Sequence, residues 1–357
     1  MPLVSVELFT GAGGLALGTR AAGFEHRALV EWNDDACATL RRNVEARTLA
    51  GIEHWDVREG DVRDVDFRAL GPVDLVAGGP PCQPFSLGGK HRASADARNM
   101  IPEFARAVRE LAPRAFIMEN VRGLLRPAFA PYFNYVLRQL QNPDVVPTEG
   151  EDWSAHLARL ETSVGGLRYD VFHEVLNAAD FGVPQSRERV FVVGFRADLG
   201  IRWAFPEATH SKAALLRAQG RAQRDDGRLP WRTVREAISD LPVPTVSGRD
   251  PTHRLIPGAR SYPGHTGSPL DWPSKTLKAG VHGVPGGENT VVLDDGSIRY
   301  VTVREAARLQ TFPDAWILQG AWSEVMRQIG NAVPMALAAV VAQAVAGRLE
   351  AERAAAK

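Results

Sequence analysis

One cysteine lies in a proline-rich segment of a kind that displays a reactive side chain. The segment Gly79-Pro-Pro-Cys-Gln-Pro-Phe-Ser86 follows a short apolar run that is typical of a buried strand. Two prolines before Cys82 exclude a helix interior, so we expect the thiol on a loop at the carboxyl end of that strand. A thiolate is a potent nucleophile that can leave again by elimination. Cys82 is therefore a candidate nucleophile, and the alternative is a tight turn with an inert thiol.

Charged side chains stand at two further strand ends. In Phe116-Ile-Met-Glu-Asn-Val-Arg-Gly123, apolar residues lead into Glu119. Burial there would raise the pKa of this carboxyl, which could then present a proton at neutral pH. In the motif that starts at Gln185, strand alternation places Gln185, Arg187 and Arg189 on one face. Two guanidinium groups on one face can bind a base carbonyl or a phosphate, and the alternative is a solvated charged edge.

A glycine-rich turn near the N-terminus predicts a nucleotide-like cofactor. Leu8-Phe-Thr-Gly-Ala-Gly-Gly-Leu15 follows a strand pattern and precedes a helix pattern, and Glu31 stands twenty residues past Gly11. An acid at that position can hydrogen bond ribose hydroxyls. This pattern alone fits a nicotinamide dinucleotide and S-adenosylmethionine comparably well. Trp32 either stacks on a purine or packs in the core, and Asp61 either accepts from an adenine amino group or caps a helix or turn.

The elements that must position these residues alternate between strand and helix patterns over the first 195 residues. Helix patterns include Asp34–Ala46 and Ile101–Leu111. The alternation predicts an α/β fold with a doubly wound, mostly parallel sheet, in which ligands bind beyond the carboxyl ends of the strands. The expected strands are Val4–Phe9, Ala28–Glu31, Val73–Ala77, Ala115–Met118, Val171–Leu176 and Val190–Phe195.

Later parts of the chain have a different texture. From 196 to 300 proline and glycine are dense, which predicts a second, smaller, irregular β-rich domain. Residues 291–300 are typical of a hairpin with Asp295-Gly296 at its turn. The alanine-rich stretch Pro334–Glu352 predicts a helix. The polar segment Gln141–Gly166 is interpreted as an irregular surface excursion without an assigned role.

Composition narrows the class of protein. No long apolar run and no secretory signal pattern is visible, which predicts a cytoplasmic protein without a membrane partner. The two cysteines, Cys37 and Cys82, are too few for a disulfide framework or a cysteine-based zinc site, and Cys37 is expected to be buried in a helix. The formal net charge is zero, but residues 185–260 hold 14 Arg plus Lys against 8 Asp plus Glu. This region is either a phosphate-binding surface or a solvated loop with a chance charge bias.

Taken in order, the motifs resemble those of the 5-methylcytosine DNA methyltransferases, and the resemblance runs from Leu8 to about Leu337. One such motif would be weak, but all of them occur in the order of that family. They are Phe9-Thr-Gly-Ala-Gly-Gly14, Glu31-Trp32, Pro80-Pro-Cys-Gln83, Glu119-Asn-Val121, Gln185-Ser-Arg-Glu-Arg189, Arg304-Glu-Ala-Ala-Arg-Leu-Gln310 and Gln328-Ile-Gly-Asn-Ala-Val-Pro334.

The resemblance implies a role for each matching position. Cys82 would attack a flipped-out cytosine, Glu119 would contact the pyrimidine N3, Arg189 its O2, and Arg187 would lie near the nucleophile. Asn120 would buttress the loop. S-adenosylmethionine would be the cofactor, with no metal. Its pocket would be lined by Phe9, Gly11, Gly13, Leu15, Glu31, Trp32, Asp61, Val62, Pro81, Asn331 and Ala332. Double-stranded DNA would be contacted by Gln83, Ser86, Arg98, Gln185 and Thr276.

The resemblance also implies an organisation and a set of partners. A discontinuous catalytic domain would comprise 1–197 plus 326–357, and a target-recognition domain with its hinge would comprise 198–325. We expect a bacterial, cytoplasmic monomer that either is linked in function to a restriction endonuclease or acts alone. The alternatives are the tRNA-modifying branch of the family and a catalytically silent DNA-binding regulator. The first is disfavoured because no Cys-Phe-Thr occurs in 196–300. A nicotinamide oxidoreductase would explain the glycine turn but neither Cys82 nor Glu119.

Overall fold

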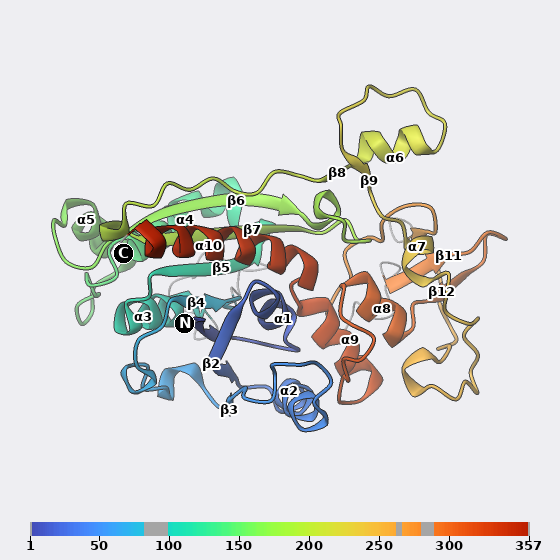
Figure 1. The fold of residues 1–357 in the computed structure, drawn as a ribbon, viewed down its shortest axis with the longest axis horizontal. Helices are drawn as coiled ribbons and strands as arrows, with labels where there is room; N and C mark the ends of the chain where they lie inside the picture. The colour runs from blue at the N-terminus through green and yellow to red at the C-terminus, as the bar shows by residue number, and fades with distance from the viewer. Residues whose placement is uncertain (1, 82–98, 262–265, 280–288, 356–357) are drawn as a thin grey trace.

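A seven-stranded sheet forms the centre of the molecule (Figure 1). The computed structural model describes residues 2–81, 99–261, 266–279 and 289–355, so the predicted site residues Cys82, Gln83, Ser86 and Arg98 lie outside the described residues. The strand order is β3-β2-β1-β4-β5-β7-β6. The strands are β1 (Leu3–Leu8), β2 (Phe24–Glu31), β3 (Val57–Glu59), β4 (Leu75–Gly78), β5 (Ala115–Val121), β6 (Tyr169–Asn177) and β7 (Glu188–Arg196).

The directions of these strands confirm the predicted doubly wound, mostly parallel sheet. β1, β2, β3, β4 and β5 pair in parallel, and only β7 runs antiparallel to its two neighbours. Short apolar runs such as the fully buried Leu75–Gly78 form the central strands, as parallel strands covered on both faces require. β3 was not predicted, because its three residues include no buried side chain.

Helices cover both faces of the sheet. α3 (Ile101–Leu111) and α4 (Ala130–Gln141) cover one face, and α10 (Met335–Ala355) covers the other together with α1 (Gly14–Ala21). α2 (Asp34–Ala46) follows β2, and its Asn33 cap accepts a hydrogen bond from the amide of Ala36. The predicted helices at 34–46, 101–111 and the C-terminus are therefore present. Cys37 in α2 is fully buried, as expected.

The C-terminal helices are apolar enough to raise the question of a membrane. By length and composition alone, the helical stretch 322–355 would pass as a membrane span, and 61% of its most apolar window is buried inside the protein. α10 lies against α1 so closely that a Cβ at Gly18 would stand 2.4 Å from the Cβ of Ala338. Packing against α1 and the sheet thus accounts for the apolar composition of α10.

The excursion at 141–166 contains a helix, so the prediction of an irregular segment is wrong. α5 (Trp153–Thr162) begins at Asp152, whose side chain accepts from the amides of Ser154 and Ala155 at 2.8 and 2.9 Å. His156 and Leu160 are buried, and α5 packs against α4. The spacing of Trp153, His156 and Leu160 is the helical signal that the polar flanks concealed.

The second region combines short strands with short helices. The predicted hairpin at 291–300 is confirmed: Leu293 donates to the carbonyl of Ser297 at 2.8 Å, and Gly296 adopts a φ of +80° at the turn. The limits of the predicted domains stay a prediction. The strands are β8 (His210–Ser211), β9 (Leu229–Pro230), β10 (Ser268–Pro269), β11 (Thr290–Val292) and β12 (Ile298–Tyr300). The helices are α6 (Lys212–Ala218), α7 (Val234–Ile238), α8 (Val303–Leu309) and α9 (Trp322–Asn331).

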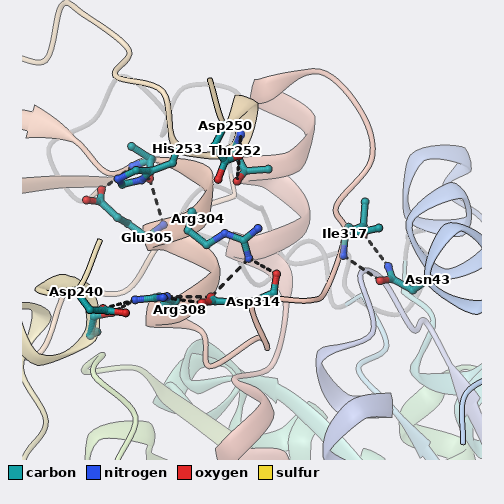
Figure 2. A network of polar contacts seen from close by, with 12 residues as sticks. Asn43, Asp240, Asp250, Thr252, His253, Arg304, Glu305, Arg308, Asp314 and Ile317 are labelled. Atoms are coloured by element: carbon teal, nitrogen blue, oxygen red, sulfur yellow. Dashed lines mark hydrogen bonds and ion pairs between the residues drawn. The ribbon is translucent and has the colours of Figure 1, made fainter. Parts of the chain in front are cut away.

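Polar contacts fasten this second region around α8 (Figure 2). The guanidinium of Arg308 lies between the carboxylates of Asp240 and Asp314. At the start of the same helix, the Nδ1 of His253 lies 2.8 Å from the hydroxyl of Thr302, which caps α8. These contacts hold the loops before α8 in place without long strands.

Candidate functional site

The ends of three neighbouring strands come together at one edge of the sheet. The register pairs Leu8 of β1 with Gly78 of β4, and Gly78 with Met118 of β5. The next residues along the three strands therefore lie side by side: Phe9 and Gly79 just past the ends of β1 and β4, and Glu119 still within β5. The strand order reverses between β1 and β4, which is where open α/β sheets bind ligands.

Glu119 is a buried carboxyl held by an arginine. Only 7% of Glu119 is exposed, and its Oε1 lies 2.9 Å from the Nε of Arg189. Burial raises the pKa of Glu119, while the charges of Arg189 and Arg187 offset part of that rise. A Cβ at Gly79 would stand 3.2 Å from the Oε2 of Glu119, so the chain that leads to Cys82 passes directly beside this carboxyl.

Two hydrogen bonds fix the backbone just before Cys82. The Nδ2 of Asn120 donates to the carbonyl of Pro80 at 3.0 Å, which is the buttress that the sequence predicted. The amide of Met100 donates to the carbonyl of Pro81 at 3.1 Å. The approach to the predicted nucleophile is thus held by β5 on one side and by the start of α3 on the other.

Arg187 and Gln185 lie in the interior rather than on an open face. Arg187 is fully buried, and its two terminal nitrogens donate to the carbonyls of Leu277 at 3.1 Å and Gly330 at 2.7 Å. Burial, together with the charge of Arg189, holds the pKa of Arg187 well below its usual range. Gln185 is also fully buried; it donates to the carbonyl of Leu309 and accepts from the amide of Leu277. A DNA contact by Gln185 would require it to leave these partners.

A third buried side chain, Gln310, lies in the same junction between Gln185, Arg187 and the carbonyls that they bind. Its role was not predicted from the sequence. The Nε2 of Gln310 donates to the carbonyls of Ile329 at 2.6 Å and Ala332 at 3.1 Å, while its Oε1 accepts from Gln185. The available signal was its position at the end of the motif 304–310. Thr276 lies at the rim of the same junction, where its hydroxyl donates to the carbonyl of Ser186 at 2.9 Å.

The glycine turn after β1 is tied to Glu31. Phe9, Gly11 and Gly13 all have left-handed φ angles, of +57°, +55° and +91°. The amide of Gly11 donates to the Oε2 of Glu31 at 2.7 Å, and the Oε1 accepts from the amides of Trp32 and Asn33. A carboxylate accepts about four hydrogen bonds, so Glu31 keeps roughly one position for a hydroxyl donor.

The C-terminal part of the chain returns to this turn. A Cβ at Gly14 would stand 2.3 Å from the carbonyl of Val333, so only glycine allows the contact. The indole of Trp316 donates to the carbonyl of Ala12 at 3.0 Å. Of the predicted pocket residues nearby, Ala332 and Leu15 are buried and Asn331 is exposed. Segments from opposite ends of the sequence therefore build one turn region.

Asp61 adopts the alternative that the sequence left open for it, which was a cap. Its Oδ1 accepts from the amide and the Nε of Arg63, both at 2.9 Å, at the start of the 3-10 helix Val62–Asp64. These bonds lower the pKa of Asp61 to about 2. The amide of Gly60 donates to the carbonyl of Glu31, so Asp61 still follows a strand end next to β2. Val62 beside it is buried.

The chemistry of this edge fits a nucleoside-type cofactor. Trp32 is 71% exposed at the end of β2, where an unpacked aromatic can stack on a base. A Cβ at Gly11 would meet no atom within 4 Å, so open space adjoins the backbone of the turn. Glu31 supplies a hydroxyl acceptor. Among the described residues, no cluster of His, Cys, Asp and Glu has the arrangement of a metal site.

Comparison with known proteins gives one consistent family. The profile described as C-5 cytosine-specific DNA methylase matches residues 3–144 and 148–347. The chain is 34% identical to the Type II methyltransferase M.PspPI of a Psychrobacter species over 97% of this chain and 79% of that protein. It is 32% identical to the Type II methyltransferase M.NgoMIV of Neisseria gonorrhoeae over 99% of this chain and all of that one.

Solved structures share the fold at low sequence identity. A DNMT2 of Spodoptera frugiperda superposes with a TM-score of 0.64 at 16% identity, covering 96% of this chain and 99% of that one. A protein described as a DNA modification methyltransferase from an Escherichia coli prophage superposes with a TM-score of 0.63 at 22% identity. That match covers 98% of this chain and 99% of the other.

Proposed function

Because the chain belongs to the C-5 cytosine-specific DNA methylases, we propose a specific chemical route for its reaction. The protein is a DNA (cytosine-5)-methyltransferase, similar to the methyltransferases of restriction-modification systems. The proposed route takes the methyl group from S-adenosylmethionine, acts on a cytosine flipped out of the duplex, and passes through a covalent bond between Cys82 and C6.

Cys82 and Glu119 perform complementary steps on the ring. The thiolate of Cys82 forms a bond to C6, and the electron pair of the C5–C6 double bond moves toward N3 and makes C5 nucleophilic. The carboxyl of Glu119 gives a hydrogen bond or a proton to N3, which stabilises that charge by about 3 kcal/mol, as single preorganised donors do. Formation of the C5–CH3 bond would break the S–CH3 bond and release S-adenosylhomocysteine. A base then removes the C5 proton, N3 returns its proton to Glu119, the C5–C6 double bond re-forms, and Cys82 leaves as a thiolate.

Arg189 and the glycine turn prepare the site for these steps. The Arg189 guanidinium holds the Glu119 carboxyl in one orientation and is itself held, because its Nη1 donates to the carbonyl of Glu188 at 2.8 Å. S-adenosylmethionine, when bound, supplies an electrophilic methyl group. Glu31 would accept from its ribose and Trp32 would stack on its adenine. The base must leave the stack first, at a cost of a few kcal/mol.

The observation that carries this proposal is the contact between Gly79 and Glu119. A buried carboxyl with a raised pKa stands beside the backbone three residues before Cys82. This arrangement supports the proposal that adjacent strands of the sheet supply the nucleophile and the proton donor. An oxidoreductase on the same glycine turn has no use for this arrangement.

Trapping the covalent bond tests the proposal. Duplex DNA carrying 5-fluorocytosine at the methylated position should form a stable adduct, because fluorine cannot leave C5 as a proton does. Cys82→Ala should form no adduct and show no turnover, whereas Cys37→Ala, which removes the buried thiol in α2, should retain both. Bisulfite sequencing of plasmid DNA from a host without cytosine methylation supplies the target site. Turnover by Cys82→Ala would overturn the route, and methylation of transfer RNA but not of DNA would redirect the substrate.

A further inference from the structure

Two helices that the proposed reaction does not use, α4 and α5, lie against each other. Trp153, the first residue of α5, packs on two tyrosines of α4: its ring lies 6.5 Å from that of Tyr132 and 5.9 Å from that of Tyr135. The family model matches residues 148–347, so α5 lies within the matched part of the chain. The rings of Trp153, Tyr132 and Tyr135 form one aromatic cluster between the two helices.

Tyr132 connects α4 to the part of the chain beside the site. The Nδ2 of Asn99 donates to the hydroxyl of Tyr132, and both residues are buried, with 8% and 6% exposed. Asn99 is the first described residue after 82–98. Its Oδ1 also accepts from the amide of Ile101, where α3 begins. Tyr132 thus holds the point at which the chain returns from the segment that carries Cys82.

The two ends of that segment are also joined to each other. The amide of Met100 donates to the carbonyl of Pro81 at 3.1 Å, and Pro80 is held by Asn120 at 3.0 Å. A displacement of Asn99 would therefore reach Pro81 through one residue and one hydrogen bond. Both ends belong to one hydrogen-bonded frame that runs from β5 through Pro80 and Met100 to Tyr132.

We propose that Tyr132, supported by Trp153, is a positioning residue for methyl transfer. Through Asn99 it fixes the downstream anchor of the segment that carries the nucleophile, and α5 supports the Tyr132 ring through Trp153. This role rests on the proposed function of Cys82. Misplacing a reacting group by about 1 Å can cost about a hundred-fold in rate, so a buried anchor at this point has kinetic weight.

Tyr135 offers a matched control on the same helix. It is also 6% exposed and packs on the same Trp153. Its hydroxyl donates to the Nδ1 of His156 at 3.0 Å, because the Nε2 of that ring must carry the proton that it gives to the carbonyl of Val145 at 2.7 Å. Tyr135→Phe and Tyr132→Phe each remove one buried hydroxyl from the same aromatic cluster, but only the second breaks the bond to Asn99.

The experiment compares kcat, the KM for target DNA and the melting temperature of the full-length variants. Tyr132→Phe should lower kcat about ten-fold, the effect expected of removing one hydrogen bond, and leave the KM for DNA within about two-fold. Tyr135→Phe should keep the wild-type kcat, although its melting temperature should fall about as much as that of Tyr132→Phe. Since Asn99 transmits the effect, the pair Asn99→Ala and Tyr132→Phe should lower kcat no further than Asn99→Ala alone.

A second comparison tests the part played by α5. Trp153→Ala should lower kcat, whereas Leu160→Ala, which truncates a side chain of the same helix that is 2% exposed, should lower stability without changing kcat. Equal kcat values for Tyr132→Phe and Tyr135→Phe, or strictly additive losses with Asn99→Ala, would overturn the positioning role. An inactive wild-type protein would instead count against the proposed function, so the two failures are distinguishable.

Discussion

The charged side chains of the candidate site are mostly buried at the edge of the large sheet, whereas most of those in the arm at residues 212–232 are exposed. At the sheet edge Glu119, Arg187 and Arg189 are nearly dry, and each is held by named partners within 3.1 Å. In the arm, which comprises α6 and the loop to β9, Arg221, Arg224 and Arg228 are exposed. Figure 1 shows this arm projecting from the body of the protein near the end of β6.

This difference in burial suits the two regions to different kinds of contact. Burial raises the pKa of Glu119 and so favours its protonated form, while the charge of Arg189 offsets part of that rise. Exposed arginines on a projecting arm keep their charge and their mobility, which suits the phosphates of a long duplex and not one reacting base. The arm is anchored beside the site, since the indole of Trp231 donates to Asp180 at 2.8 Å.

The largest expected effect concerns the dry region. Glu119→Gln should lower kcat by about a hundred- to a thousand-fold at unchanged DNA affinity, because an amide cannot protonate N3. The raised pKa keeps Glu119 protonated at a higher pH than an ordinary glutamate, so the wild-type rate should fall as pH rises through that pKa. Single-turnover rates against pH measure both, and Glu174→Gln is the control, because Glu174 pairs with the same Phe191 from the exposed side of β7.

A second effect concerns the packing that brings the C-terminal helix to the glycine turn. Gly18→Ala should cost about 1–3 kcal/mol of unfolding free energy, because its Cβ would stand 2.7 Å from the backbone nitrogen of Ala339. Gly347→Ala lies in the same α10, meets no atom within 4 Å, and should stabilise the protein by about 0.5–1 kcal/mol. Urea unfolding monitored by circular dichroism measures the two. Equal effects would show that α1 and α10 do not depend on this close approach.

The smallest effect concerns the exposed arm. Replacing Arg221, Arg224 and Arg228 by glutamine should make the slope of log K against log salt shallower by about 0.9 for each phosphate that the arm no longer neutralises. The value of kcat at saturating DNA should not change. Binding titrations at several salt concentrations supply the slope. A control with the same reduction of charge replaces Arg42, Arg47 and Arg68, which are exposed in the first part of the chain. An equally large change of slope in that control would show that the arm has no particular role in binding phosphates.

Much of the large sheet could be predicted because its strands are short apolar runs. The bounds of β1, β4, β5 and β7 fall within a few residues of the predicted ones. β2 extends further than predicted, from Phe24, since its first half alternates exposed and buried side chains instead of forming an apolar run. The motifs placed Glu31 at the end of β2, where the structure has it, whereas β5 continues two residues beyond Glu119 to Val121.

The positions that the sequence did not reveal depend on long-range contacts. Strand alternation put Gln185 and Arg187 on one face of a strand, but it could not show that Arg187 binds carbonyls 90 and 143 residues away, which bury it. No local pattern contains that information. α5 is a different case, because its helical spacing was present and the polar composition around it was given too much weight.

β7 is the strand of the large sheet that runs opposite to its neighbours, and its direction sets the length that the following segment must have. β7 starts at the site and carries the backbone to the opposite edge over nine residues, or about 30 Å. The chain must then come back, and Figure 1 shows it running beside β6 to reach β8. Its path over 201–209 also has nine residues, or about 30 Å when extended, and ends where Thr209 donates to the carbonyl of Asp180. The segment 201–209 therefore spans this distance only when it is almost fully extended. Deletions in it would separate the arm from Asp180, whereas insertions would be tolerated.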